Sequence, residues 1–245
     1  MSLPGKIVEW LMRRYPDRST EVALRYLPVV RILRDAGVGK VLEVGSGDLG
    51  ITPYSRDFEL TGLDVSFERE NPGMTQVKGS ASKLPFEDRE FDAVISVDSL
   101  EHIAKKDREL AVMEILRCAH RLVVIAVPSG AAAMDQDSFL DERYRKVRGE
   151  AYPFLQEHIE GGLPEPEELE QVIVRSLRRQ GRSGGVTLHR NSNLWIRSFL
   201  MKGWISQNRF YHNLAVLGLM PVAGILSRMN GGRCYRVIAE VDITG

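Results

Sequence analysis

Short apolar runs alternate with longer segments of helical periodicity from residue 40 onward. Candidate strands lie at 40–44, 59–64, 75–78, 91–97 and 121–127, and residues 107–118 have helical spacing. Strands that alternate with helices form a mostly parallel sheet with helices on both faces. The pattern therefore predicts an α/β fold with a doubly wound, mostly parallel sheet.

The flanking segments have other patterns. Residues 6–36 have helical spacing, with a kink expected at Pro28. The periodicity lapses over 129–163, which predicts a long loop, and a helix is expected to begin at Pro164. Two further strands are expected at 185–190 and 234–242.

The chain has 245 residues and is 43% hydrophobic, which is enough to bury a sizeable core. We predict one domain over 1–245. Its expected parts are an N-terminal helical cover at 1–36, a sheet core at 37–190 and 233–245, and a substrate-covering insertion at 191–232.

Composition excludes several classes of protein. Cys118 and Cys234 are too few for a disulfide framework or a zinc cluster, so we expect a reducing compartment and no bound metal. Charged residues interrupt the first fifteen positions, which argues against a signal peptide. The uncharged stretch 210–227 is too short and too polar for a membrane-spanning helix, which needs about 20 apolar residues. We therefore expect a cytoplasmic enzyme.

The segment VLEVGSGDLG, at 41–50, places glycines directly after a predicted strand. Gly45 permits a tight turn, and Gly47 allows a ligand to approach the backbone. Asp64 ends the next predicted strand, where a carboxylate can accept hydrogen bonds from ribose hydroxyls. Together these residues predict a nucleoside-containing ligand at the carboxyl edge of the sheet.

With these motifs the chain resembles the class I S-adenosylmethionine-dependent methyltransferases of the small-molecule branch. The resemblance rests on the glycine segment, the LTGLDVS run around Asp64, and the KGSASKLPFEDREFDAVISVDSLEHI run at 78–103. It implies a seven-stranded, Rossmann-like sheet that ends in an antiparallel hairpin, and S-adenosylmethionine as cofactor, with S-adenosylhomocysteine as product.

The resemblance also implies roles for single residues. Glu43 and the turn of Gly45, Ser46 and Gly47 would face the methionine part of the cofactor. Asp64 would bind the ribose, and the loop with Ser80 and Ala81 would contact the adenine. Val65 and Val97 complete the implied cofactor site.

Two positions depart from the family pattern. The third glycine of the first motif often stands two residues after the second, whereas here Leu49 occupies that place and Gly50 follows. The adenine loop often has an acidic residue where this chain has Ser80. A serine hydroxyl accepts a hydrogen bond without charge assistance, so weaker cofactor binding is expected.

Two alternatives to a methyltransferase remain open on the sequence. The spacing of Gly45, Gly47 and Gly50 with Asp64 also satisfies the dinucleotide fingerprint of an NAD-dependent oxidoreductase. A cofactor-binding scaffold without catalysis, acting through a basic surface, is the second alternative.

Methyl transfer to a hydroxyl group benefits from a base, and histidine suits this role because its ordinary pKa is about 6.5. His102, after the fourth predicted strand, and His158, in the predicted long loop, are the candidates. The alternative for each is a ring that only hydrogen-bonds a loop carbonyl. We expect transfer to a small or lipid-like acceptor, on oxygen in preference to nitrogen or carbon.

The C-terminal third is strongly basic. Between Glu170 and Glu240 there are eleven Arg or Lys residues and no acidic residue, although the whole chain has zero formal net charge. Such a run suggests an anionic partner. Either this region is a lid over the substrate pocket, or Trp195, Trp204 and the segment 214–226 enter an anionic membrane surface. Nucleic acid is not favoured, because no accessory RNA-binding module is recognisable.

Overall fold

The computed structural model describes residues 3–244, so residues 1, 2 and 245 of the predicted domain lie outside the described part. Within that part, a seven-stranded sheet has the order β3-β2-β1-β4-β5-β7-β6. The strands are β1 (Lys40–Val44), β2 (Glu59–Asp64), β3 (Thr75–Lys78), β4 (Phe91–Val97), β5 (Ala119–Pro128), β6 (Ser183–Asn193) and β7 (Cys234–Thr244). The first five are parallel, and β7 pairs antiparallel with both β5 and β6. The predicted mostly parallel α/β sheet and its terminal antiparallel hairpin are confirmed.

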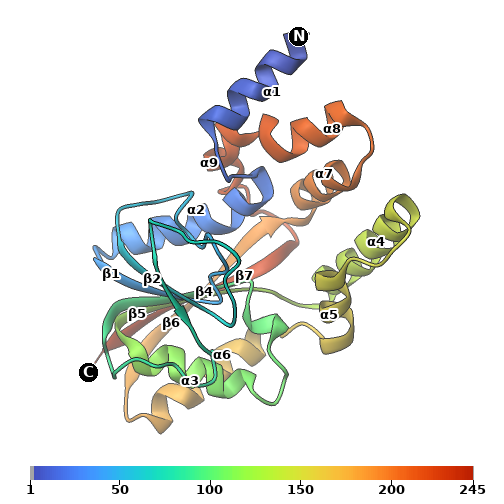
Figure 1. Ribbon diagram of the computed structural model, residues 1–245. Coiled ribbons are helices and arrows are strands. Elements are labelled where there is room, and N and C mark those ends of the chain that lie inside the picture. Colours follow the sequence, from blue (N-terminus) through green and yellow to red (C-terminus); the bar gives the residue numbers. More distant parts are fainter. Residues whose placement is uncertain (1–2, 245) are drawn as a thin grey trace.

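Helices cover both faces of the sheet (Figure 1). On one face lies α2 (Thr20–Asp35), which buries Val29, Val30 and Leu33 against the strands. On the other lie α3 (Arg108–Cys118) and α6 (Pro166–Arg179). The middle strands are apolar on both sides because both faces are covered, and β5 is buried continuously from Leu122 to Pro128.

The ends of these helices follow from the sequence. Ser19 caps α2, because its side chain accepts a hydrogen bond from the backbone nitrogen of Val22. Helix α6 begins at Pro166, whose fixed φ suits a first turn, and its last turn contains Arg178 and Arg179.

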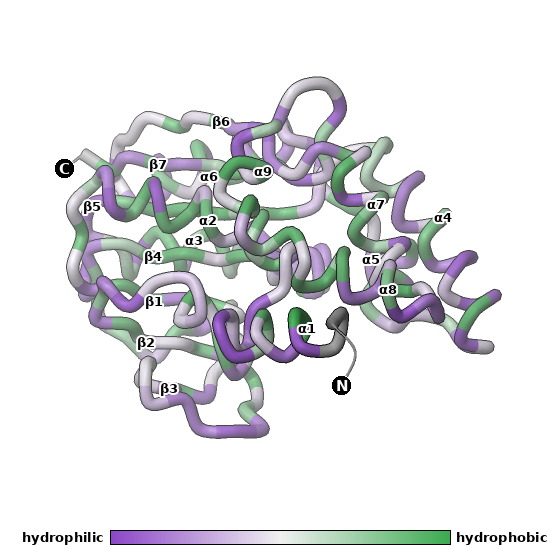
Figure 2. Tube along the Cα trace, turned by 90° about the horizontal axis from the view of Figure 1, so that it is seen from above, coloured by the Kyte–Doolittle hydropathy of each residue, from purple (hydrophilic) through white to green (hydrophobic). Residues whose placement is uncertain are grey.

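The predicted loop over 129–163 is wrong, because most of this stretch is helical. Helix α4 (Ala131–Arg148) and helix α5 (Pro153–Gly161) pack against each other. Figure 2 shows α4 extending from the body, with hydrophilic segments along its length. Helix α4 buries few apolar residues, chiefly Ala133 and Leu140. Its sequence therefore lacks the apolar stripe by which an amphipathic helix is recognised.

The insertion between β6 and β7 is helical. It contains α7 (Leu194–Ile205), α8 (Arg209–Asn213), a π-helical turn at Leu214–Gly218, a 3-10 turn at Met220–Val222 and α9 (Ala223–Leu226). Together with α1 (Leu3–Arg14) it lies beyond α2 in Figure 1. In residues 3–244 no helix combines the length and apolarity that crossing a bilayer requires.

Candidate active site

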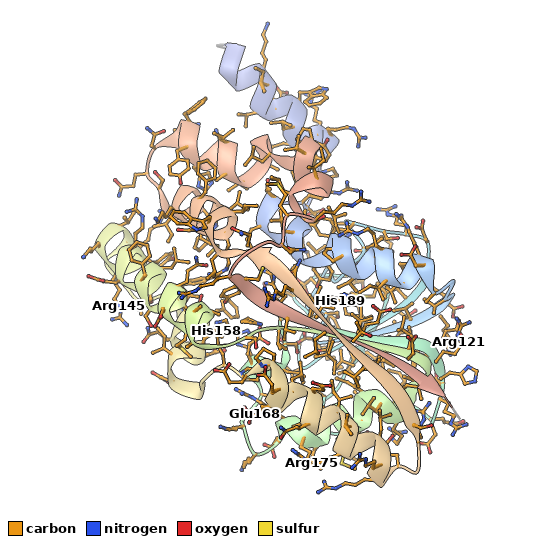
Figure 3. The ribbon with its side chains drawn as sticks, turned by 180° about the vertical axis from the view of Figure 1, so that it is seen from behind. Arg121, Arg145, His158, Glu168, Arg175 and His189 are labelled. Atoms are coloured by element: carbon orange, nitrogen blue, oxygen red, sulfur yellow. The ribbon has the colours of Figure 1, made fainter. Side chains whose placement is uncertain are left out.

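A cavity of about 320 Å³ opens at the carboxyl edge of the sheet, beneath the helical cover. Its walls come from α2, the segment after β4, α5, α7 and the start of β7. His158 of α5 lies far from Arg121, near the start of β5, which marks the opposite edge (Figure 3). The carboxyl edge, where the cavity lies, is the edge at which open α/β sheets bind their ligands.

Part of the wall is apolar and aromatic. Leu200, Met201 and Trp204 of α7 face the cavity with Phe154 and Leu155 of α5. The Trp204 ring stacks on Tyr144, with their centroids 5.7 Å apart. Trp204 thus belongs to the cavity wall, which fits the alternative of a lid over the substrate pocket.

A buried ion cluster joins the end of β4 to β7 and α2. Both carboxylate oxygens of Asp98 accept hydrogen bonds from Arg236, at 2.5 Å each, and Arg25 lies 3.1 Å from Oδ2. Burial raises the pKa of Asp98, but the guanidinium groups of Arg236 and Arg25 outweigh it and lower this pKa to about 2. Asp98 has a positive φ of 48°, which an aspartate tolerates better than a branched residue.

His158 is held by a second buried cluster. Its Nδ1 lies 2.8 Å from Oδ2 of Asp137, which also accepts a hydrogen bond from the Tyr235 hydroxyl at 2.8 Å. Arg197 donates to the other oxygen of Asp137 at 3.0 Å. Because the Asp137 carboxylate can only accept, Nδ1 of His158 is assigned the proton, and Nε2 keeps its lone pair.

His102 lies beside His158, and their ring centroids are 5.1 Å apart. Its Nδ1 is 2.5 Å from Oε2 of Glu157. Burial lowers the pKa of His102, and His158 adds to this, whereas the hydrogen bond with Glu157 opposes it. The structure therefore brings together the two histidines that the sequence proposed.

Glu101 lies beside the two histidines and is buried, with 3% of its surface exposed. Among the described residues, neither of its carboxylate oxygens has a hydrogen-bond partner. Oε1 lies 3.9 Å from Nε2 of His158, which also lacks a partner in that part of the chain. Burial and the nearby Asp98 raise the pKa of Glu101 well above its usual range.

The predicted cofactor turn follows β1. The backbone nitrogen of Gly45 donates to Leu63 O at 2.8 Å, and φ is +78° at Gly45 and +54° at Gly47. A Cβ on Gly45 would lie 1.9 Å from the Ser99 Oγ, whereas one on Gly47 would meet no atom within 4 Å. Gly47 thus exposes its backbone to open space, and its nitrogen donates to Asp64 Oδ2 at 2.8 Å.

Glu43 has a different environment from the one expected. Its carboxylate is buried and accepts hydrogen bonds from the Tyr26 hydroxyl and the Ile51 backbone nitrogen, each at 2.8 Å. Burial raises the pKa of Glu43 to about 7, although both hydrogen bonds oppose the shift. In this structure the Glu43 carboxylate holds the segment that follows the glycine turn.

The other predicted cofactor residues fall into an exposed and a buried group. Val65 is 76% exposed directly after Asp64, and Ser80 is exposed with its hydroxyl 2.9 Å from that of Ser82. Ala81 is half-buried. The side chains of Ser46 and Val97 are buried, Val97 in the core beside α2.

These residues fit an adenosyl group. The open space at Gly47 admits a ligand against the backbone, and the partly exposed Asp64 carboxylate can accept from ribose hydroxyls. The exposed Val65 offers an apolar contact for a purine ring.

Asp98 and Arg236 line the cavity and Asp137 holds the His158 ring, yet none of the three is predicted from the sequence. Asp98 could have been found, because it directly follows a strand that ends at the binding edge of the sheet. Asp137 lies in the stretch that was predicted to be a loop. No local signal marks Arg236, which was counted only as part of the basic run.

Known proteins resemble this chain in sequence. A family model described as "Methyltransferase domain" matches residues 42–126. A demethylmenaquinone methyltransferase from Beutenbergia cavernae is 30% identical over 167 residues, 64% of this chain and 69% of that protein. The enzyme of the same name from Mycobacterium tuberculosis H37Rv is 28% identical over 181 residues, 70% of this chain and 74% of that protein.

Solved structures share the fold at low sequence identity. The plantazolicin methyltransferase BpumL superposes with a TM-score of 0.56 at 11% identity, covering 98% of this chain and 90% of that one. The magnesium protoporphyrin IX methyltransferase of Synechocystis PCC 6803 gives 0.51 at 13% identity, covering 99% of this chain and 88% of that one. Both structures contain S-adenosylhomocysteine.

The family model covers the glycine turn, Asp64 and the strand that ends before Asp98. This agreement decides against the oxidoreductase alternative and identifies S-adenosylmethionine as the cofactor. The chain belongs to the class I S-adenosylmethionine-dependent methyltransferases.

Proposed function

We propose that this methyltransferase acts on a hydroxyl group of a small, apolar acceptor of the quinone-like or lipid-like class. The observation that carries the proposal is the cavity, whose apolar wall from α5 and α7 faces a polar floor at the end of β4. An apolar pocket with a few polar groups that fix orientation is the usual form of a small-molecule site. The names of the matched relatives support a quinone-like acceptor.

The chain's own groups would place the acceptor. Trp204 and Leu200 contact its apolar ring or tail, and the lid of α7 excludes water. The acceptor hydroxyl is directed to the floor, where Glu101, His102 and His158 converge. Alignment of two reactants can by itself supply a large part of a rate enhancement.

The cofactor residues are proposed on the same basis. Gly47 would approach the cofactor through its backbone, Asp64 would bind the ribose, and Val65 with Ser80 and Ala81 would border the adenine. Glu43 would act indirectly, by holding the segment that follows the turn. When bound, S-adenosylmethionine supplies an electrophilic methyl group on its sulfonium.

Of the two candidate bases, His158 has the more firmly fixed ring. Asp137 fixes its ring by accepting from Nδ1, so that Nε2 can take the hydroxyl proton. His102 lies closer to solvent, and Glu157 fixes its ring in the same way.

The second proposal concerns the surface through which a lipid-like acceptor enters. Trp195 of α7, Phe210 of α8 and Ile225 of α9 are 86%, 74% and 66% exposed. These side chains would enter the interface of an anionic membrane. Arg197 and Arg236 would not meet headgroups, because both are buried with acidic partners.

The acceptor can be tested with purified full-length protein and methyl-labelled S-adenosylmethionine. A short-chain naphthoquinol is compared with the same compound carrying both hydroxyls as methyl ethers. We expect an O-methylated product, identified by mass spectrometry, from the quinol alone. A product methylated on a ring carbon would overturn the assignment to oxygen, and no turnover of any quinol would overturn the acceptor class.

A further inference from the structure

Three side chains at the cavity floor form a set that the reaction alone does not explain. Glu101, His102 and His158 each offer a ligand atom, and these atoms lie within 4.8 Å of one another. A modest adjustment of side chains would bring three such atoms to a common centre at metal–ligand distances of about 2 Å.

Two of these side chains are buried without a partner for the atoms concerned. The Glu101 and His158 side chains are 1% and 7% exposed, and in the described chain both Glu101 oxygens and His158 Nε2 lack hydrogen bonds. A buried polar group without a partner is costly, so each instance calls for an explanation such as an ion. Arg108 does not supply the partner, because it donates to the Glu101 backbone oxygen at 2.9 Å.

The orientation of both histidines supports the same conclusion. Nδ1 of His158 bonds to the Asp137 carboxylate, and Nδ1 of His102 bonds to the Glu157 carboxylate. In metal sites the ligating histidine usually donates its other ring N–H to a carboxylate or carbonyl, which fixes the tautomer. Each ring here is thus left with Nε2 as its free ligand atom.

We propose that Glu101, His102 and His158 bind one divalent first-row transition cation through a carboxylate oxygen and two Nε2 atoms. Two imidazoles and one carboxylate suit zinc, manganese, iron or cobalt better than magnesium or calcium, which prefer oxygen ligands. This departs from the expectation that the chain binds no metal. That expectation rested on its cysteines, whereas no cysteine belongs to this set.

A cation at the cavity floor would act directly on the acceptor. Three protein ligands leave open coordination positions, as in catalytic zinc sites, and the three residues all line the cavity. An acceptor hydroxyl bound there would be oriented by the cation and its pKa lowered. In the loaded protein the His158 Nε2 would be a ligand, so the acceptor would bind the cation as its anion, with its hydroxyl proton released to solvent on binding, and no imidazole base would be needed.

Cation binding itself is independent of the acceptor, and only its effect on catalysis rests on the proposed function. The test therefore uses chelator-treated full-length protein, without acceptor or cofactor, titrated with Co²⁺ and followed by visible absorption and calorimetry. We expect one Co²⁺ per chain, displaced by Zn²⁺, and a higher melting temperature with the ion.

Glu101→Gln is the main variant, because it keeps the shape of the side chain and removes the charge. We expect it and His158→Gln to weaken Co²⁺ binding at least tenfold and to abolish the ion-dependent rise in melting temperature. His189→Gln is the matched control, since His189 pairs with Glu240 and does not line this cavity. Circular dichroism checks that each variant is folded.

Absence of Co²⁺ and Zn²⁺ binding at millimolar concentration would overturn the proposal. Binding that a folded Glu101→Gln protein retains at full strength would also overturn it, because the ion would then lie elsewhere. Neither result bears on the acceptor. Conversely, intact Co²⁺ binding without turnover of any quinol would leave the cation site in place and remove the proposed acceptor.

Discussion

Asp137 of α4 and His158 of α5 form a buried hydrogen bond of 2.8 Å between two helices of the cavity cover. The same carboxylate accepts from Tyr235 of β7 and Arg197 of α7. One acidic side chain therefore ties the cover to the sheet and sets the direction of the His158 ring.

Replacement of His158 tests this arrangement in the reaction. We expect His158→Gln to lower kcat at least 100-fold, the scale of a lost acid–base or activating group. The dissociation constant for S-adenosylhomocysteine should stay within a factor of two, because His158 lies outside the predicted cofactor residues. Steady-state kinetics and calorimetry measure the two quantities. His189→Gln is the control, and an equal loss of kcat there would remove the special role of His158.

Asp64 is predicted to bind the cofactor ribose. Asp64→Ala should weaken binding of S-adenosylhomocysteine by about 1–3 kcal/mol, because hydrogen bonds to a charged group are lost. The substitution also removes the acceptor for the Gly47 backbone nitrogen, so part of the loss in affinity would come from a less well ordered glycine turn. Calorimetry measures the effect against Asp57→Ala, which removes only a surface pair with Arg34. An unchanged dissociation constant in Asp64→Ala would contradict the ribose assignment.

The two glycines of the turn should respond differently to alanine. Gly45→Ala creates both a positive-φ alanine and a clash with Ser99, so we expect a loss of about 2–4 kcal/mol in the free energy of unfolding. Gly47→Ala carries only the backbone strain of about 1–2 kcal/mol, but its methyl group enters the open space assigned to the cofactor. Urea denaturation and calorimetry separate the two effects. Equal stability of the two variants would contradict the packing of Gly45 against Ser99.

The buried Glu43 should make stability depend on pH. Its pKa is raised from 4.5 to about 7 by burial, so the folded protein binds more protons than the unfolded chain between these values. Stability is therefore lost as the pH rises through this window, by up to about 3 kcal/mol. In Glu43→Gln the amide oxygen can accept from the Ile51 nitrogen while the amide NH2 donates to a reoriented Tyr26 hydroxyl, so this variant should gain stability relative to the wild type at pH 8 but not at pH 4.5. Urea denaturation at both pH values provides the test, and a difference that does not change with pH would refute the shift.

Membrane association should depend on the exposed apolar side chains of the insertion. We expect co-sedimentation with anionic vesicles that fades with added salt, because headgroup attraction is screened. Trp195→Ala should weaken vesicle binding about tenfold, equivalent to about 1.4 kcal/mol. Leu110→Ala, which alters an exposed residue on the opposite face of the sheet, should bind as the wild type does. Equal binding to neutral and anionic vesicles would exclude an electrostatic contribution to membrane binding.

The sheet could be predicted because its parallel strands are buried on both faces and appear as separate apolar runs. Helix α4 could not, because a helix that contacts the body through a few residues has no continuous apolar stripe. The glycine turn and Asp64 are local in sequence, so their proximity was predictable. The pairing of Asp98 with Arg236, 138 residues apart, depends on the antiparallel return of β7 and has no local signature.

The position of β7 joins two parts of the molecule. This strand lies between β5 and β6, and its Arg236 reaches the Asp98 carboxylate in the cavity wall. Disruption of β7 would therefore open the acceptor chamber and detach β6 from the parallel strands, even though every residue of the glycine turn would still be present.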